Sequence, residues 1–129
     1  VMTDILAQVQ EGNHGSIVID TTGSVVHTGK DLYEMLKQYS IVIYIEASKN
    51  MKEKMFEQYL KEPKPVVFGD VYSQEEGETS IQTLSRCYRK LLDLRSTLYA
   101  ECADVIIPRK AIEENMSIHK FISLVKHAI

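Results

Sequence analysis

A short apolar run that ends in small polar residues is the stretch of this chain best suited to chemistry. Residues 16–20, with the sequence SIVID, predict a strand buried on both faces of a mostly parallel sheet. Thr21, Thr22 and Gly23 follow it and offer two hydroxyl groups and an uncrowded backbone N–H. Ligands of open α/β sheets bind at the carboxyl ends of strands, which makes these residues candidates for binding a substrate. An ordinary turn is the alternative, because Gly, Asp, Ser and Thr are common in turns.

The histidines and cysteines form no recognisable metal or redox motif. No histidine pairs with a carboxylate at the helical spacing of metal sites, and the two cysteines do not form a C-x-x-C motif. We therefore predict no metal site and expect the histidines to be surface residues. The residues concerned are His14, His27, His119, His127, Cys87 and Cys102.

The composition favours one globular domain that spans residues 1–129. The chain is 44% hydrophobic and 26% charged, and 129 residues suit one domain better than two. A formal net charge of −3 gives no electrostatic basis for binding nucleic acid or an anionic membrane. No signal-like segment and no apolar run of about 18 residues is present. We expect a cytoplasmic protein without nucleic-acid or membrane partners.

Hydrophobic periodicity predicts alternating helices and strands that would position the candidate residues. Two buried strands separated by a helix predict a right-handed βαβ unit, and therefore a parallel α/β sheet. Two prolines follow the third helix, and the polar segment 63–78 after it is expected to form a mobile, lid-like loop. The expected helices are 2–9, 30–38, 49–61, 79–102 and 111–129; the expected strands are 16–20, 40–47 and 103–107, with a brief extended piece at 25–26.

The order of these elements and three motifs resemble the carboxyl-terminal two-thirds of the shikimate kinases. The most specific match is RSTLYAECAD at 95–104, which looks like the family's R-x-x-L-Y-x-x-x-A-D signature before the last strand. VIYIEAS at 42–48 is similar to the family's fourth strand, and KPVV at 64–67 lies where the family has the R-P-L-L of its lid. The resemblance implies a parallel three-layer α/β/α sheet of the nucleoside-monophosphate-kinase type.

The resemblance also implies roles for residues of the substrate site. Arg95 would bind an anionic group of the substrate together with the 21–23 turn, where the family usually carries three glycines. An ordinary salt bridge between Arg95 and Asp93 or Glu101 is the alternative for a helical arginine. Asp104, at the end of the same motif, is expected to be structural and to hold the entry to the last strand.

The nucleotide side of the site is implied in the same way. Lys64 takes the place of the family's lid arginine, which reaches the transferring phosphates, although lysine lacks the bidentate fork of arginine. Lys54 lies near the position of an adenine-side arginine, and Pro108 ends the last expected strand on the nucleotide side. ATP and Mg²⁺ are therefore the implied cofactors.

The phosphate-binding loop of such kinases is absent from this sequence. Phosphoryl transfer in this fold needs a strand, G-x-x-x-x-G-K-[ST] and a helix, and no such motif occurs. Residues 23–31 approach it, but the first glycine is misplaced and no Ser or Thr follows Lys30. The family's first strand, which lies between those expected at 16–20 and 40–47, is also absent. We expect this incomplete sheet to be closed by direct pairing, by a second chain or by an upstream segment that carries the motif.

Two functional hypotheses follow. In the first, the chain is the carboxyl-terminal portion of a shikimate-kinase-like, ATP-dependent phosphotransferase that acts on a small hydroxylated acid such as shikimate. In the second, it is a non-catalytic domain that binds a small metabolite at residues 21–23 and Arg95, or that associates with a partner. Nucleotide binding separates the two hypotheses.

Overall fold

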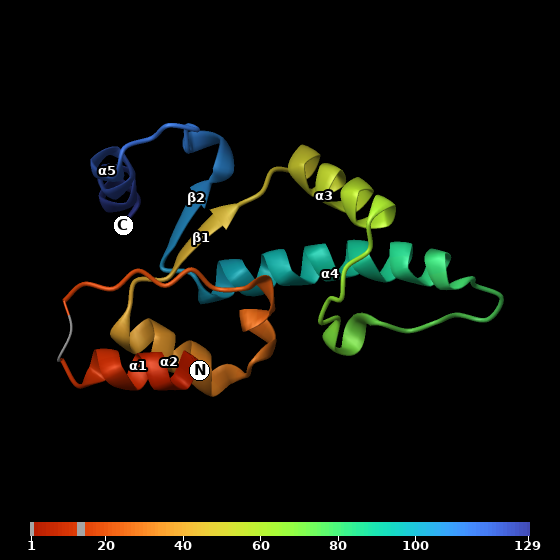
Figure 1. Ribbon diagram of the computed structural model, residues 1–129, viewed down its shortest axis with the longest axis horizontal. Helices are drawn as coiled ribbons and strands as arrows, with labels where there is room; N and C mark the ends of the chain where they lie inside the picture. Colours follow the sequence, from red (N-terminus) through yellow and green to blue (C-terminus); the bar gives the residue numbers. More distant parts are fainter. Residues whose placement is uncertain (1, 13–14) are drawn as a thin grey trace.

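The computed structural model, which describes residues 2–12 and 15–129, is mixed α/β and mostly helical, with a small two-stranded parallel sheet. Figure 1 shows the elements in order. The helices are α1 (Met2–Gln10), α2 (Lys30–Tyr39), α3 (Lys49–Lys61), α4 (Ser80–Cys102) and α5 (Ile118–Ala128). The strands are β1 (Ile43–Glu46) and β2 (Val105–Pro108), and the 3₁₀ helices are η1 (Gly23–His27), η2 (Gly69–Val71) and η3 (Arg109–Ala111).

The sheet pairs β1 with β2 in parallel, from Ile43 opposite Val105 to Glu46 opposite Pro108. Asp104 fixes the entry to this pairing. Its backbone N–H donates to the Val42 carbonyl at 2.8 Å, and its carboxylate accepts the Val42 N–H at 2.9 Å. The structural role predicted for Asp104 is thereby confirmed.

One hydrophobic cluster lies between the sheet and α5, and further buried side chains lie on α3 and α4. Val105 and Ile107 are 2% and 1% exposed and pack with Val125 of α5, as the two-residue alternation of a strand places them on one face. On the other face, the ring of Tyr44 lies 5.2 Å from that of Tyr99 on α4.

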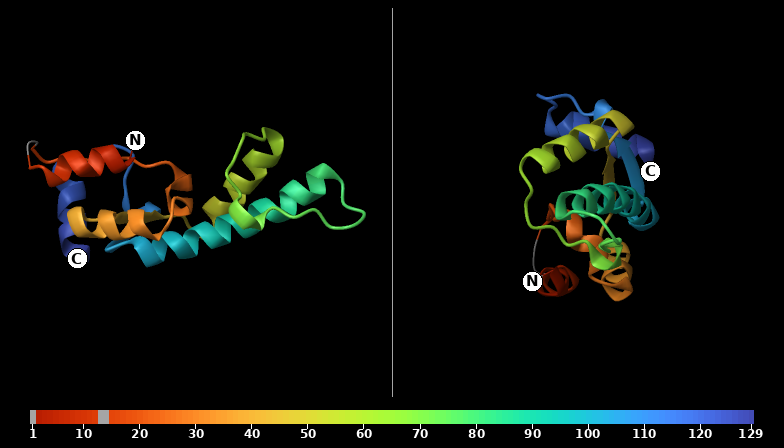
Figure 2. Two further views of the ribbon diagram at one scale, coloured as in Figure 1. Left: turned by 90° about the horizontal axis from the view of Figure 1, so that it is seen from below. Right: turned by 90° about the vertical axis from the view of Figure 1, so that its right-hand side faces the viewer.

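Helix α4 runs along most of the length of the molecule, and α3 packs beside its first half (Figures 1 and 2). Its first turn is closed by a capping box between Thr79 and Gln82. The rings of Tyr59 on α3 and Tyr88 on α4 stack with centroids 3.8 Å apart and planes inclined by 9°. These contacts hold α4 as a rigid support for the residues on its carboxyl-terminal half.

The prediction of a buried strand at 16–20 is wrong. These residues form no regular secondary structure and pair with no strand among the described residues, and Val18 is 96% exposed. The βαβ unit expected between this segment and β1 is therefore not formed. A β-branched run needs a neighbouring strand to satisfy its backbone N–H and C=O groups, and no neighbour is available here.

Further boundaries differ from prediction. Residues 25–26 belong to η1 rather than to an extended piece, β1 spans Ile43–Glu46 rather than 40–47, and β2 spans Val105–Pro108 rather than 103–107. The last helix begins at Ile118 rather than at 111, because the Ser117 hydroxyl caps it by accepting the Lys120 N–H at 3.2 Å. The four earlier helices are confirmed within two residues of their predicted bounds. None of the helices in the described part of the chain is long and apolar enough to cross a bilayer.

Candidate functional site

Helix η1 is held between α2 and α4 by two tyrosines. The Tyr33 hydroxyl of α2 donates to the Val26 carbonyl, and the Tyr99 hydroxyl of α4 donates to the Gly23 carbonyl at 2.6 Å. Both bonds go to backbone carbonyls of η1, so they fix the path of the turn itself. The segment that contains the predicted Thr21, Thr22 and Gly23 is thus anchored at its carboxyl-terminal end.

Arg95 joins three separate segments of the chain. Its Nε donates to Nε2 of His27 in η1 at 3.3 Å, and its Nη2 donates to the Val67 carbonyl at 2.9 Å. Val67 lies in the 63–78 loop, and Arg95 itself projects from α4. Arg95 as a whole residue is of intermediate exposure, and these segments meet at its guanidinium.

Gly23 leaves room for this arrangement. A Cβ at Gly23 would lie 3.0 Å from the Tyr99 hydroxyl oxygen and 3.1 Å from Nη1 of Arg95. Both distances are shorter than ordinary contacts of a side-chain carbon. The structure therefore brings Gly23 and Arg95, two of the residues predicted to bind substrate, into direct proximity.

The Arg95 guanidinium has neutral partners only. Within residues 2–12 and 15–129 it forms no ion pair with any carboxylate. Asp93, one of the two acids considered for a salt bridge, lies 3.9 Å from Lys52 instead. The salt-bridge alternative is therefore wrong for this structure, and no described residue of opposite charge pairs with Arg95.

The pKa values of two titratable groups beside Arg95 are shifted in opposite directions. Burial, and next the charge of Arg95, lower the pKa of His27 below its ordinary value of 6.5. Burial raises the pKa of Tyr99 above its ordinary value of 10.0, against the opposing charge of Arg95. Near neutral pH, His27 is therefore uncharged and accepts the Arg95 hydrogen bond, while the Tyr99 hydroxyl stays protonated and donates.

The other residues predicted for the substrate site and the lid lie outside the cluster formed by Gly23, His27, Arg95 and Tyr99. Thr21 and Thr22 are exposed immediately before η1, and the Thr22 hydroxyl lies 3.1 Å from that of Ser24. Lys64 is exposed on the loop, three residues before Val67. These side chains border the Arg95 cluster in sequence, and their roles stay predictions.

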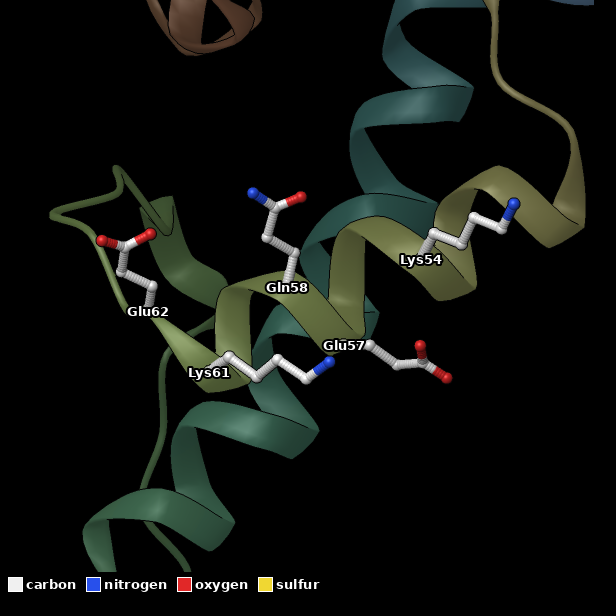
Figure 3. Close-up of a pocket in the computed structure, with 5 residues that line it drawn as sticks. All are labelled: Lys54, Glu57, Gln58, Lys61 and Glu62. Carbon is white, nitrogen blue, oxygen red and sulfur yellow. The ribbon is translucent and has the colours of Figure 1, made fainter.

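Lys54 lies on the exposed surface of α3, in an open hollow of about 360 Å³. The five residues that line the hollow come from α3 and its carboxyl-terminal cap, and Figure 3 shows their side chains extending in different directions. Four of the five are charged, two with each sign. Pro108 ends β2 beside Glu46 and does not line this hollow, so the two predicted nucleotide contacts do not form one pocket.

The residues that the structure describes do not fit ATP and Mg²⁺. After β1 the chain passes through Ala47 to Ser48, whose hydroxyl is used to cap α3 by accepting the Met51 N–H at 3.3 Å. After β2 it enters η3 without a glycine-rich turn. Neither strand is followed by the sequence G-x-x-x-x-G-K-[ST], which forms the phosphate-binding loop of such kinases. Among the described residues, no group of three or more His, Cys, Asp or Glu is placed to hold a metal ion.

His27 and Tyr99 are members of the cluster that the sequence did not identify as functional. His27 was expected on the surface, but it is partly buried and accepts a hydrogen bond from Arg95. His14 lies outside the described residues. Tyr99 follows Arg95 by four residues, and this spacing places both side chains on one face of α4. That spacing within the 95–104 motif is the signal that could have identified Tyr99.

A second cavity, of about 530 Å³, lies on the α2 side of η1. It is lined in part by His27, Tyr33, Lys37 and Cys102, and Arg95 is not among its lining residues. Burial raises the pKa of the Cys102 thiol, which makes this cysteine a weak nucleophile near neutral pH. The cavity is therefore adjacent to the Arg95 cluster and separate from it.

Comparison with known proteins adds no relative from which residue roles could be taken. No family model, no curated protein and no solved structure matches this chain. The resemblance to shikimate kinases is carried by the motif residues alone, and the candidate site by the contacts of Arg95.

Proposed function

We propose that this chain binds a small hydroxylated carboxylic acid, such as shikimate, at Arg95, beside the turn that begins η1. The observation that carries the proposal is the Arg95 guanidinium, whose hydrogen bonds go to His27 and to the Val67 carbonyl and, within the described residues, to no carboxylate. The positive charge of such a guanidinium attracts an anion. A carboxylate would supply the missing charge and can accept two parallel hydrogen bonds from a guanidinium.

The hydroxyl groups near Arg95 support an acid that also carries hydroxyls. Tyr99 is placed beside Gly23, and Thr22 and Ser24 present two further hydroxyl oxygens at the start of η1. A hydroxyl group both donates and accepts, so it can pair with a ligand hydroxyl in either sense. The combination favours a polyol acid over a purely apolar carboxylate.

Phosphoryl transfer to the same acid is the second candidate, and the RSTLYAECAD motif at 95–104 favours it. In this proposal the chain is the carboxyl-terminal portion of a shikimate-kinase-like enzyme with a three-layer α/β/α sheet, and Lys64 belongs to its lid. ATP and Mg²⁺ would be held by a segment with the motif G-x-x-x-x-G-K-[ST], upstream or in a second chain. Because the described residues do not fit those cofactors, we assign binding rather than catalysis to the described residues.

Calorimetric titration with shikimate tests the proposed binding. We expect Arg95→Gln to weaken binding by about 1.5 to 3 kcal/mol, the range for hydrogen bonds to charged groups, or roughly 10- to 150-fold. Lys90→Gln is the matched control, because it removes an exposed cation from the same helix and changes the net charge equally. Thermal unfolding of both variants shows whether the fold is retained.

Two results would contradict the binding proposal. One is no detectable shikimate binding by the wild-type chain at millimolar concentration, and the other is equal affinity in the wild type and Arg95→Gln. Titration with MgATP distinguishes the second candidate function, phosphoryl transfer, from binding of the acid alone. Nucleotide binding by residues 1–129 alone would favour a complete kinase, whereas we expect none.

A further inference from the structure

His27 is placed so that its charge state bears directly on Arg95. Its Nε2 accepts the Arg95 Nε–H at 3.3 Å, which assigns the ring proton of the neutral form to Nδ1. Nδ1 lies on the side of Gly69, 3.4 Å from the position that a Cβ there would take. The imidazole thus lies between Arg95 of α4 and Gly69 of the 63–78 loop.

The charged groups around His27 do not neutralise a proton on its ring. Arg95 faces it from α4, and Lys30 and Lys37 of α2 share the adjacent cavity with it. Glu34, which also lines that cavity, is 3.8 Å from Lys30, and Glu101 lies on the α4 side. Within the described residues, His27 forms no ion pair with either glutamate.

Protonation of His27 therefore has opposite consequences in the free and the anion-bound site. In the free site, the proton occupies the lone pair that accepts the Arg95 hydrogen bond and places two cations side by side. An anion seated against both groups changes this balance, since each cation can then donate to the same negative charge. Anion binding and proton uptake by His27 must then favour each other by linkage.

We propose that His27 is a second, proton-dependent ligand of the anion that binds Arg95. The inference rests on the proposed function, because it concerns the same site, and it adds the regulation of that site by pH. Its direct consequence is that affinity for a carboxylate rises as the pH falls through the titration range of His27. The steepest dependence that a single coupled proton allows is about tenfold per pH unit.

The direction of the pH dependence follows from the pKa of His27 in the free site and in the anion-bound site. Burial, and next the charge of Arg95, lower the pKa of His27 below 6.5 in the free protein. An anion bound against the ring would raise this pKa, because it favours the charged form. Binding is therefore independent of pH well above the bound value, strengthens between the bound and free values, and levels off below the free value. A shikimate carboxylate, with an ordinary carboxyl pKa near 4, stays ionised throughout the range from about pH 7.5 to about 5.5.

Calorimetric titration with shikimate from about pH 7.5 to about 5.5, on the wild type and on His27→Gln, tests the inference. A glutamine can still accept the Arg95 hydrogen bond through its amide oxygen, but it cannot gain a proton in this range. We expect wild-type affinity to rise about fivefold or more as the pH falls, and the His27→Gln affinity to stay within about twofold. His119→Gln, which removes an exposed histidine of α5, should behave as the wild type.

An NMR titration of the His27 ring, with and without saturating shikimate, distinguishes the ways in which the proposal could fail. A higher His27 pKa in the complex than in the free protein supports it. Binding with the same pH dependence in the wild type and His27→Gln, or an unchanged His27 pKa, overturns this inference and leaves the proposed function standing. No binding by the wild type at any pH overturns both.

Discussion

At the scale of single residues, the missing side chain of Gly23 decides how closely η1 can approach Arg95 and Tyr99. Gly23 has no positive φ, so its backbone conformation does not require glycine. The limited space around this position does require glycine, because a Cβ would lie 3.0 Å from the Tyr99 oxygen and 3.1 Å from Arg95 Nη1. We infer that this glycine serves the positions of two side chains rather than the shape of the turn.

Gly23→Ala tests that inference. The two atoms that meet the new methyl group are the ends of flexible side chains, so we expect the free energy of unfolding to change by less than about 1 kcal/mol. We expect shikimate affinity to fall about tenfold, because Arg95 and Tyr99 must move. Gly15→Ala is the control, since Gly15 has open space around it and no positive φ. Equal affinities of both variants in calorimetric titration would show that the approach of Gly23 to Arg95 has no role in binding.

The sequence could identify Gly23 and Arg95 but not His27, and the difference has a physical reason. Arg95 stands in a local motif, and Gly23 follows an apolar run, so both carry signals from their neighbours. The contact between His27 and Arg95 joins residues 68 positions apart. A single histidine without periodic partners gives no sign of such a contact, which only the packing of η1 against α4 creates.

At the scale of elements, hydrogen bonds from Arg86 of α4 hold the carboxyl-terminal part of the 63–78 loop. Its Nε and Nη2 donate to the two carboxylate oxygens of Glu78 at 2.7 Å each, and Nη2 also donates to the Ser73 carbonyl at 2.6 Å. The Thr83 hydroxyl adds a bond to Glu78 at 3.0 Å. Motion of this loop as a lid stays a prediction, and these bonds confine it to the part before Ser73.

The pH dependence of stability should report on this anchor. Hydrogen bonds from Arg86 lower the pKa of Glu78 from 4.5 to about 2, so the carboxylate stays ionised in the folded protein at pH values where it is protonated in the unfolded chain. Its contribution is present above about pH 4.5 and is lost as the pH falls toward about 2. We expect Glu78→Gln to be less stable than the wild type near pH 6, and the difference to shrink as the pH falls.

Thermal unfolding of the wild type and Glu78→Gln across this pH range measures the anchor. Glu76→Gln is the matched control, because Glu76 is an exposed acid of the same loop. A difference between wild type and Glu78→Gln that does not change with pH would show that the Arg86 bonds add no pH-dependent stability.

The elements that the sequence predicted well are those whose signals are local. Ser48 and Thr79 cap α3 and α4 as side-chain acceptors, and caps together with apolar periodicity define both helices. The strand predicted at 16–20 had only its β-branched composition. Since a strand also needs a partner, which composition does not supply, that prediction was wrong.

At the scale of the whole molecule, the sheet is very small, and the residues buried on it pack against α5. Ile107 is 1% exposed under α5, whereas Ile17 and Val18, which the sequence placed in the sheet interior, are 47% and 96% exposed. A parallel sheet is normally covered on both faces and paired on both sides of its inner strands. This sheet has two strands only in the described part of the chain, so the exposed segment contributes little to the core.

Two alanine substitutions compare the segment with the core. Ile107→Ala should cost about 2 to 5 kcal/mol, the range for removing a buried aliphatic side chain, and Val18→Ala should cost less than about 0.5 kcal/mol. Chemical denaturation of both variants measures the difference. A loss of several kcal/mol for Val18→Ala would show that residues 16–20 are buried in solution, as a paired strand or in an assembly.

Titration of shikimate and of its uncharged methyl ester into the wild type and Arg95→Gln shows whether the Arg95 charge binds a ligand carboxylate. The ester removes the charge of the ligand, and Arg95→Gln removes the charge of the protein. We predict that the ester binds both proteins with nearly equal, weak affinity, and that the acid gains about 10- to 150-fold only in the wild type. Equal binding of acid and ester by the wild type would contradict the account, because the guanidinium would then make no contact with the carboxylate.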